Sequence, residues 1–172
     1  MKVSGIHCSE NEIGLVLMKI NIVNIKAIKV AAFEHLGEPE TLDQSVETFR
    51  VWRKESGCSS VAEKRTFGIA HSDPEAKPAQ PFHFDICCEV GIDVAENSYG
   101  VINKEIPAGR CARLRHQGAY DGLKLKVNAF YRSWLPSTEE SKRDAPIFFE
   151  YLNFAVEVPE DELMTDIYFP LK

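Results

Sequence analysis

The chain repeats its own pattern at a constant offset of 81 residues, the interval that separates Gly37 from Gly118. Residues from about Ala27 to Cys88 align without a gap with Ala108 to Phe169. The identities are Ala31 with Ala112, His35 with His116, Gly37 with Gly118, Leu42 with Leu123, Val46 with Val127, Phe49 with Phe130, Phe67 with Phe148, and Asp85-Ile86 with Asp166-Ile167. Chance would not concentrate matches on glycines, aromatic residues and a shared dipeptide. The repeat predicts a tandem duplication packed as a pseudo-twofold pair.

Each copy is predicted to be a β-α-β-β unit. Alternating and β-branched residues predict strands, an apolar stripe at helical spacing predicts a helix, and the proline after Leu135 ends the second helix. The first copy should contain one or two strands over 21–33, a helix from Thr41 or Asp43 to about Lys54, and strands over 65–70 and 82–90. The second should contain a strand over 109–117, a helix from Leu123 to Trp134, and strands over 146–153 and 164–170.

These elements predict an α+β domain with antiparallel sheets and a ligand groove between the copies. Its predicted organisation is an N-terminal extension over 1–17 and a domain over 18–172, divided into copy one (about 21–90), a linker (91–103) and copy two (about 104–171). The seam between the copies is the concave surface that both halves build, and ligand sites favour such seams.

Composition excludes several classes of function. The 172 residues carry 44% hydrophobic and 27% charged side chains and a net charge of −6, as in an ordinary globular protein. No Lys/Arg cluster of the kind that tracks phosphates is present, and both predicted helices belong to the repeat. We therefore expect no direct nucleic-acid binding and no DNA-binding domain in this chain.

The cysteines and the apolar segments predict a cytoplasmic protein. The 5 cysteines form no C-x-x-C pair, which argues against a disulfide framework or a zinc site and favours a reducing compartment. Lys19 interrupts the apolar run over 13–22, and no small-residue cleavage site follows it. No segment approaches the ~20 apolar residues of a membrane span, so no membrane partner is expected.

The histidines and aspartates give only weak indications of a functional site. His71 and His83 are a poor metal pair without a third ligand, so we expect no metal and no cofactor. His35 and His116 precede turn glycines, where an imidazole can hydrogen-bond local backbone. The repeated aspartates Asp85 and Asp166 are interpreted as symmetric structural positions.

Residues 109–123, GRCARLRHQGAYDGL, carry the pattern G-R-x-A-x-x-x-H-x-G-x-Y-x-x-L. This block resembles the GyrI-like small-molecule-binding domains, and the match continues in order from about Met18 to the C-terminus. The further matching blocks are FDIC at 84–87, WLP at 134–136, RDAP at 143–146, YLN at 151–153 and ELMTDIYFPL at 162–171.

The resemblance implies a two-copy α+β fold whose groove binds drug-like, often aromatic or cationic, compounds. The family includes effector-binding domains of AraC-type regulators, stand-alone proteins similar to the DNA gyrase inhibitor, and hydrolases of strained DNA-alkylating natural products. Many members carry an acid two positions before the strand tyrosine. Here that position is Phe149, and the acid, Glu150, follows it. Alternation predicts Phe149 and Tyr151 on one face of the strand and Glu150 on the other, unless a bulge re-aims the acid.

The expected function is small-molecule binding without chemistry. Aromatic rings would stack on a planar ligand, and an inward carboxylate would hold a cation. The candidate ligand-binding residues are Phe149, Glu150, Tyr151, Trp134, Tyr120 and Tyr168. We assign no catalytic residue, although hydrolysis supported by Glu150, Tyr151 and Trp134 stays open.

A protein partner such as DNA gyrase is the third alternative. It would be contacted through exposed acids, and the candidates are Glu139, Glu140, Glu157, Glu160, Asp161 and Glu162.

Overall fold

The computed structural model describes residues 18–72 and 80–172, which form one antiparallel sheet and two α-helices. The strands are β1 (Ile20–Ile25), β2 (Ile28–Leu36), β3 (Thr66–Ala70), β4 (His83–Glu89), β5 (Ile102–Ile106), β6 (Gly109–Gln117), β7 (Ile147–Tyr151) and β8 (Met164–Pro170). The helices are α2 (Leu42–Ser56) and α3 (Leu123–Ala129). Short 3₁₀ turns cover Pro39–Thr41, Tyr120–Gly122, Leu135–Ser137 and Glu160–Glu162. No helix of the described ranges is long and apolar enough to cross a membrane. The predicted extension over 1–17 lies outside the described residues.

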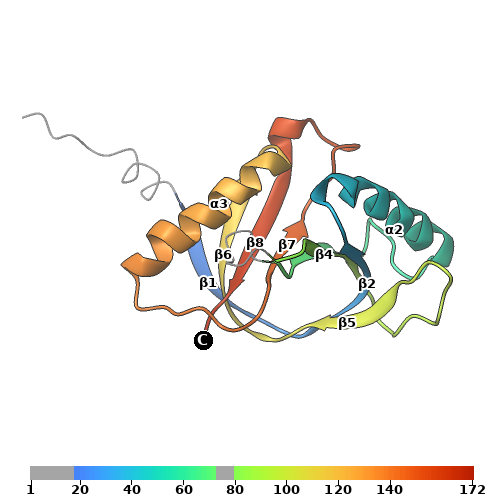
Figure 1. The fold of residues 1–172 in the computed structure, drawn as a ribbon, viewed down its shortest axis with the longest axis horizontal. Coiled ribbons are helices and arrows are strands. Elements are labelled where there is room, and N and C mark those ends of the chain that lie inside the picture. Colours follow the sequence, from blue (N-terminus) through green and yellow to red (C-terminus); the bar gives the residue numbers. More distant parts are fainter. Residues whose placement is uncertain (1–17, 73–79) are drawn as a thin grey trace, which may run out of the picture.

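Strands β3 and β7 meet at the centre of the sheet, where Gly68 pairs with Phe149. The strand order is β1-β6-β8-β7-β3-β4-β2-β5, and neighbouring strands are antiparallel. Figure 1 shows α3 over one half of this sheet and α2 over the other, with β7 and β4 between them. The predicted α+β class and antiparallel pairing are confirmed.

The sheet differs from the predicted pair of β-α-β-β units in two respects. The stretch over 21–33, predicted as one or two strands, contributes to both β1 and β2, but one further strand, β5, begins at Ile102 within the predicted linker. The strands also form a single eight-stranded sheet, since β1 pairs with β6 and β5 pairs with β2. Each edge strand thus pairs with a strand of the other half of the chain. Alternation within one strand does not specify its partner, so this pairing could not be predicted from the sequence.

The element bounds recur at the same offset of 81 residues as the sequence identities. The matching pairs are β2 with β6, Pro39–Thr41 with Tyr120–Gly122, β3 with β7, and β4 with β8. The turn histidines correspond in their bonding too. His35 Nε2 lies 3.1 Å from the carbonyl oxygen of Glu38, and His116 Nε2 lies 2.8 Å from that of Ala119. Both imidazoles bond local backbone, as predicted.

The two faces of the sheet are covered differently. On one face α2 buries Phe49 and Trp52 against β2 and β4, while Phe130 stacks on Phe169 of β8 with ring centroids 3.7 Å apart. The other face carries no helix among the described elements. Its buried side chains form an apolar cluster separate from the two clusters beneath the helices. This cluster contains Ile28, Val30, Ala32, Phe67, Ile69, Cys87, Ile106, Cys111, Phe148 and Tyr168. We call the two faces the helix face and the open face.

The second helix changes its winding before it ends. Regular α-helical hydrogen bonding stops at Ala129. A π-helical turn over Phe130–Trp134 then continues the helical segment as far as the 3₁₀ turn that contains Pro136. The predicted helical extent to Trp134 is therefore confirmed. The wider turn accompanies the stacking of Phe130 between Trp134 and Phe169.

Arg53, near the end of α2, ties that helix to the sheet. The side chain is 6% exposed, and its guanidinium donates to the carbonyl oxygens of Ser59 (2.7 Å) and Lys64 (3.1 Å). It also donates to the hydroxyl of Thr66 in β3 at 2.6 Å. Burial lowers the pKa of Arg53, and these neutral acceptors offset the loss of hydration.

The substitution Arg53→Lys should lower the free energy of unfolding by about 3 kcal/mol, because an ammonium group cannot reproduce the planar fork of donors. Urea unfolding measures the change. The matched control is Arg50→Lys on the same helix, where an exposed pair with Glu47 contributes little and no measurable change is expected. Equal effects at the two positions would contradict this role for Arg53.

Candidate functional site

The central strand β3 presents small side chains to the helix face. Phe67 and Ile69 belong to the apolar cluster of the open face, so alternation turns Thr66, Gly68 and Ala70 toward the helices. A Cβ atom built on Gly68 would lie 2.3 Å from the Phe84 ring and 2.9 Å from the Tyr151 hydroxyl. The absence of a side chain at Gly68 is what lets these two rings lie over the middle of the sheet.

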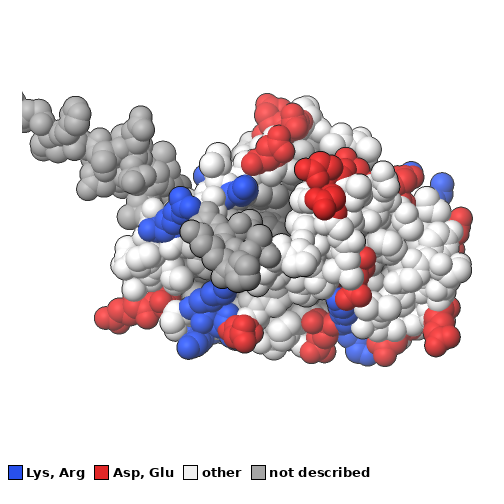
Figure 2. All heavy atoms as spheres, in the orientation of Figure 1, with Lys and Arg blue, Asp and Glu red and all other residues white. Residues whose placement is uncertain are grey.

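Aromatic rings from both halves of the sheet form a row across the helix face around Gly68. Phe82 and Phe84 are parallel at a centroid distance of 6.3 Å, and Phe84 lies 6.3 Å from Phe149 of the other half. Beside them, Tyr151 meets Tyr120 edge to face at 5.5 Å. Figure 2 shows a hollow in the surface between the two lobes that carry α3 and α2. We call this surface, made of Phe82, Phe84, Phe149, Tyr151 and Tyr120 over Gly68, the aromatic groove.

A cavity of about 570 Å³ adjoins the aromatic groove beneath α3. Ala70 and Ile147, which pair across β3 and β7, belong to its lining and connect it to the groove floor. The remaining lining residues are His71, Ser72, Gln80, Val127, Asn128, Tyr131, Arg132, Lys142, Asp144, Ala145 and Pro146. Its volume falls within the range typical of small-molecule sites.

The electrostatics of the groove follow from the orientation of its strands. The buried carboxylates of the described residues, Asp85, Glu150 and Asp166, all lie on strands at positions facing away from the helices. Burial raises the pKa values of Tyr151 and Tyr120, so both phenols stay neutral near pH 7. Acidic side chains instead gather above the hollow and on its α2 side, whereas Lys and Arg side chains flank it on the α3 side (Figure 2).

Three of the predicted ligand-binding residues lie together in the aromatic groove. Phe149 and Tyr151 share the helix face of β7, as strand alternation predicts, and Tyr120 approaches from the turn before α3. Phe149 is 7% exposed, while Tyr120 is 41% exposed and lies at the open side. Their role as ligand contacts stays a prediction.

Glu150 and Tyr168 lie on the open face, away from the groove. The Tyr168 hydroxyl donates to Glu150 Oε2 at 2.9 Å, and the Tyr168 ring stacks on Phe148 at 4.6 Å. Burial and the neighbouring Glu150 carboxylate raise the pKa of Tyr168 to about 12. Because β7 contains no bulge that re-aims the acid, Glu150 does not share a face with Phe149.

Trp134 lies at the far end of the helical segment from Tyr120. Fourteen helical positions correspond to roughly 20 Å, and the Trp134 ring stacks on Phe130 at 5.0 Å, on the side of Phe130 away from Tyr120 along the chain. The structure therefore separates the three residues considered for hydrolysis. Glu150 is on the open face, Tyr151 is in the groove, and Trp134 stacks on Phe130 near the end of the helical segment.

Gly68, Phe82 and Phe84 belong to the groove but were not among the candidate residues. A glycine inside the predicted strand over 65–70 signals close approach of a neighbouring group. The alternation of Phe82 and Phe84 around His83 likewise places both rings on one face. These signals lie in the first copy, so the groove draws on both halves.

Comparison with known proteins identifies the family. A family model described as "GyrI-like small molecule binding domain" matches residues 18–172. This chain is a GyrI-like domain. The resemblance given by the residues of the second copy is thus confirmed, and a small-molecule-binding function is supported at the level of the family.

One relative of this GyrI-like domain is named a probable transcriptional regulator. The chain is 43% identical over 154 residues to the "Probable transcriptional regulator YgiV" of Escherichia coli (strain K12), which covers 90% of this chain and 96% of that protein. Among solved structures, the C-terminal domain of EcmrR superposes with a TM-score of 0.73 at 19% identity, over 91% of this chain and 98% of that one. SAV2435 bound to tetraphenylphosphonium superposes with a TM-score of 0.54 at 12% identity, over 90% of this chain and 94% of that one. The two solved structures support the fold.

The substitution Gly68→Ala should destabilise the GyrI-like domain by about 1–3 kcal/mol, the cost typical of overpacking. The added methyl group must displace Phe84 and Tyr151. Urea unfolding measures the stability, and near-ultraviolet circular dichroism detects the changed ring packing. Gly91→Ala is the control, because an added Cβ there meets nothing within 4 Å. An unchanged aromatic spectrum in Gly68→Ala would refute the proposed packing.

Proposed function

We propose that this GyrI-like domain binds an aromatic small molecule in the aromatic groove between α2 and α3. The observation that carries the proposal is the run of rings over Gly68, supplied by β4 and β7 from the two halves of the sheet. The partly exposed rings of Phe82, Phe84, Tyr151 and Tyr120 favour stacked and edge-to-face contacts with the rings of a ligand. The adjoining 570 Å³ cavity offers room for a substituent beyond the stacked part.

The ligand class follows from where charge lies around the groove. The floor carries no buried carboxylate among the described residues, because Glu150 bonds Tyr168 on the open face. The acidic side chains above the hollow and on its α2 side, together with a net charge of −6, attract cations toward the opening, and ring faces attract them further. Hydrophobic aromatic ligands are therefore the expected class, with a positive charge tolerated and not required. The complex of SAV2435 with tetraphenylphosphonium supports the choice of an aromatic probe.

Sensing without chemistry is the role that these observations favour. The relative named as a probable transcriptional regulator supports effector binding. The separation of Glu150 from Tyr151 and Trp134 argues against the hydrolytic arrangement considered from sequence.

A tandem duplication is part of the same proposal. It is supported by element bounds that recur at one offset and by the equivalent bonding of His35 and His116. Under this duplication, the central β3–β7 pair is the seam between two copies. The groove then contains equivalent strands from each copy, with different side chains on them.

Titration with two probes of similar shape tests the proposal. Tetraphenylphosphonium is a cation, and triphenylphosphine oxide is neutral. Isothermal titration calorimetry should show binding of both to the wild type, since the floor is apolar. Tyr151→Leu and Phe84→Leu should each weaken both probes by about tenfold, the loss expected when a buried ring contact is removed.

Two further variants separate the groove from the other candidate residues. Glu150→Gln and Trp134→Leu should leave the dissociation constant of either probe unchanged, because neither side chain reaches the groove. A selective loss of the cation in Glu150→Gln would instead place that carboxylate in the site. Unchanged affinity in Tyr151→Leu and Phe84→Leu together would reject the aromatic groove.

A further inference from the structure

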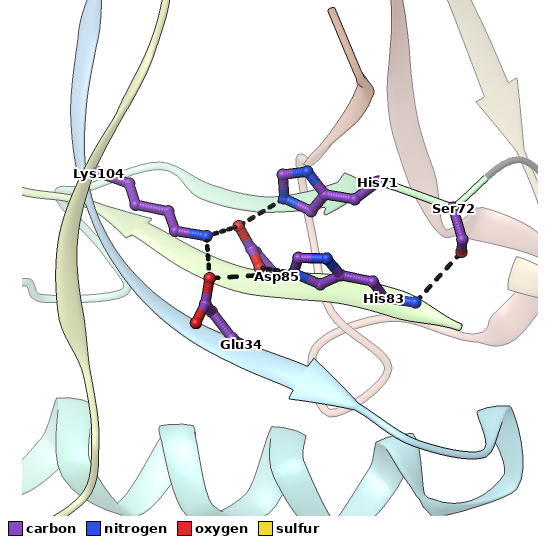
Figure 3. A network of polar contacts seen from close by, with 6 residues as sticks. All are labelled: Glu34, His71, Ser72, His83, Asp85 and Lys104. Carbon is purple, nitrogen blue, oxygen red and sulfur yellow. Dashed lines mark hydrogen bonds and ion pairs between the residues drawn. The ribbon is translucent and has the colours of Figure 1, made fainter. Parts of the chain in front are cut away.

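A cluster of polar side chains occupies the open face at the end of β3 and β4, away from the aromatic groove. Asp85 lies at its centre and is 0% exposed. Around Asp85, Figure 3 shows the imidazoles of His71 and His83, the ammonium of Lys104 and the carboxylate of Glu34. These residues come from β2, β4 and β5 and from the position directly after β3.

The two imidazoles direct their Nε2 atoms at the same carboxylate. His71 Nε2 lies 2.7 Å from Asp85 Oδ2, and His83 Nε2 lies 3.2 Å from Asp85 Oδ1. The rings are stacked with centroids 4.2 Å apart. His83 Nε2 also lies 4.0 Å from Glu34 Oε1. The sequence offered His71 and His83 without a third ligand, and the fold supplies Asp85.

The equivalent position in the second half of the chain is neutralised in another way. Asp166 there accepts two hydrogen bonds from the Arg115 guanidinium, at 2.7 and 2.8 Å. Arg115 is the cross-strand partner of Asp166, and Glu34 is the cross-strand partner of Asp85. The first half therefore places a carboxylate where the second half places a cation, and like charges directly opposite on a sheet are destabilising.

Lys104 only partly compensates this pair of carboxylates. Its ammonium donates to Asp85 Oδ2 at 2.7 Å and to Glu34 Oε1 at 2.6 Å. Burial opposes ionisation of Asp85, but the hydrogen bonds from His71 and Lys104 outweigh it and hold the pKa below its ordinary value. With neutral imidazoles, two carboxylates and one ammonium leave one negative charge in the cluster.

We propose that His71, His83 and Asp85 bind a divalent transition-metal ion of the Zn²⁺ type, with Glu34 beside the fourth position. Two imidazole nitrogens and a carboxylate oxygen are ligands that such ions prefer. The three ligand atoms lie within 4.8 Å of one another. Ligands at the usual ~2.1 Å from a tetrahedral ion lie about 3.4 Å apart, so small side-chain rotations suffice.

Access and supporting contacts fit a metal site. The side chain of His71 is 29% exposed, and a cavity of about 220 Å³ borders His71, Asp85 and Lys104. The backbone holds the two histidine positions together, because the amide of His71 donates to the carbonyl oxygen of His83 at 3.1 Å. Lys104 then acts as the resident cation, which orients the carboxylates and competes with the metal ion for them.

Calorimetric titration of the full chain, prepared without a histidine tag, with Zn²⁺ tests the site. The wild type should bind one ion, and His71→Gln and His83→Gln should each weaken binding by at least about tenfold. Cys58→Ser removes an exposed metal-binding side chain outside the cluster and should leave the affinity unchanged. Thermal melting of each metal-free variant establishes that it is folded.

Lys104→Gln distinguishes a metal site from a purely structural polar network. Loss of the ammonium should lower the melting temperature of the metal-free protein and strengthen Zn²⁺ binding, because the competing cation is gone. Bound Co²⁺ should show visible d–d absorption that disappears in the double variant His71→Gln/His83→Gln. The proposal is overturned if the wild type binds no stoichiometric Zn²⁺, or if the double variant binds it as tightly.

Discussion

The pairing of β3 with β7 is the interaction on which the rest of the structure depends. It joins two halves, each with its own helix, into one sheet, and it places Gly68 opposite Phe149. Without that pairing, the helices α2 and α3 would cover separate surfaces. With it, the space between the helices has a continuous floor, and rings from both halves meet over a position that has no side chain.

Strand alternation then assigns different chemistry to the two faces. In β7, Phe149 and Tyr151 face the helices, whereas Phe148 and Glu150 face away from them. In β4, Phe84 faces the groove and Asp85 faces the polar cluster. A shift of register by one residue would exchange these sets, placing carboxylates under the groove and rings on the open face. The apolar groove and the polar cluster are therefore two consequences of one register.

The sequence predicted what is encoded locally and missed what depends on pairing. The bounds of β6 and β8 and the opposite orientations of Phe149 and Glu150 follow from alternation and turn residues, and the structure agrees. The face of Tyr168 depends on the register between β7 and β8, which pairs it with Phe148. No pattern within either strand specifies that register. The groove residues of the first half were missed for the same reason, since their approach to Phe149 requires β3 between them.

His71 connects the two sites, because this residue lines both the cavity beneath α3 and the cavity beside the polar cluster. A ligand that contacts this imidazole from the groove side and a metal ion that binds its Nε2 from the open face would act on one ring. If the metal fixes the ring in the orientation that the ligand contacts, each binds more tightly in the presence of the other. Thermodynamic linkage requires the two enhancements to be equal. A ligand that needs the ring to turn away would give the opposite sign, so the coupling depends on the orientation of this single side chain.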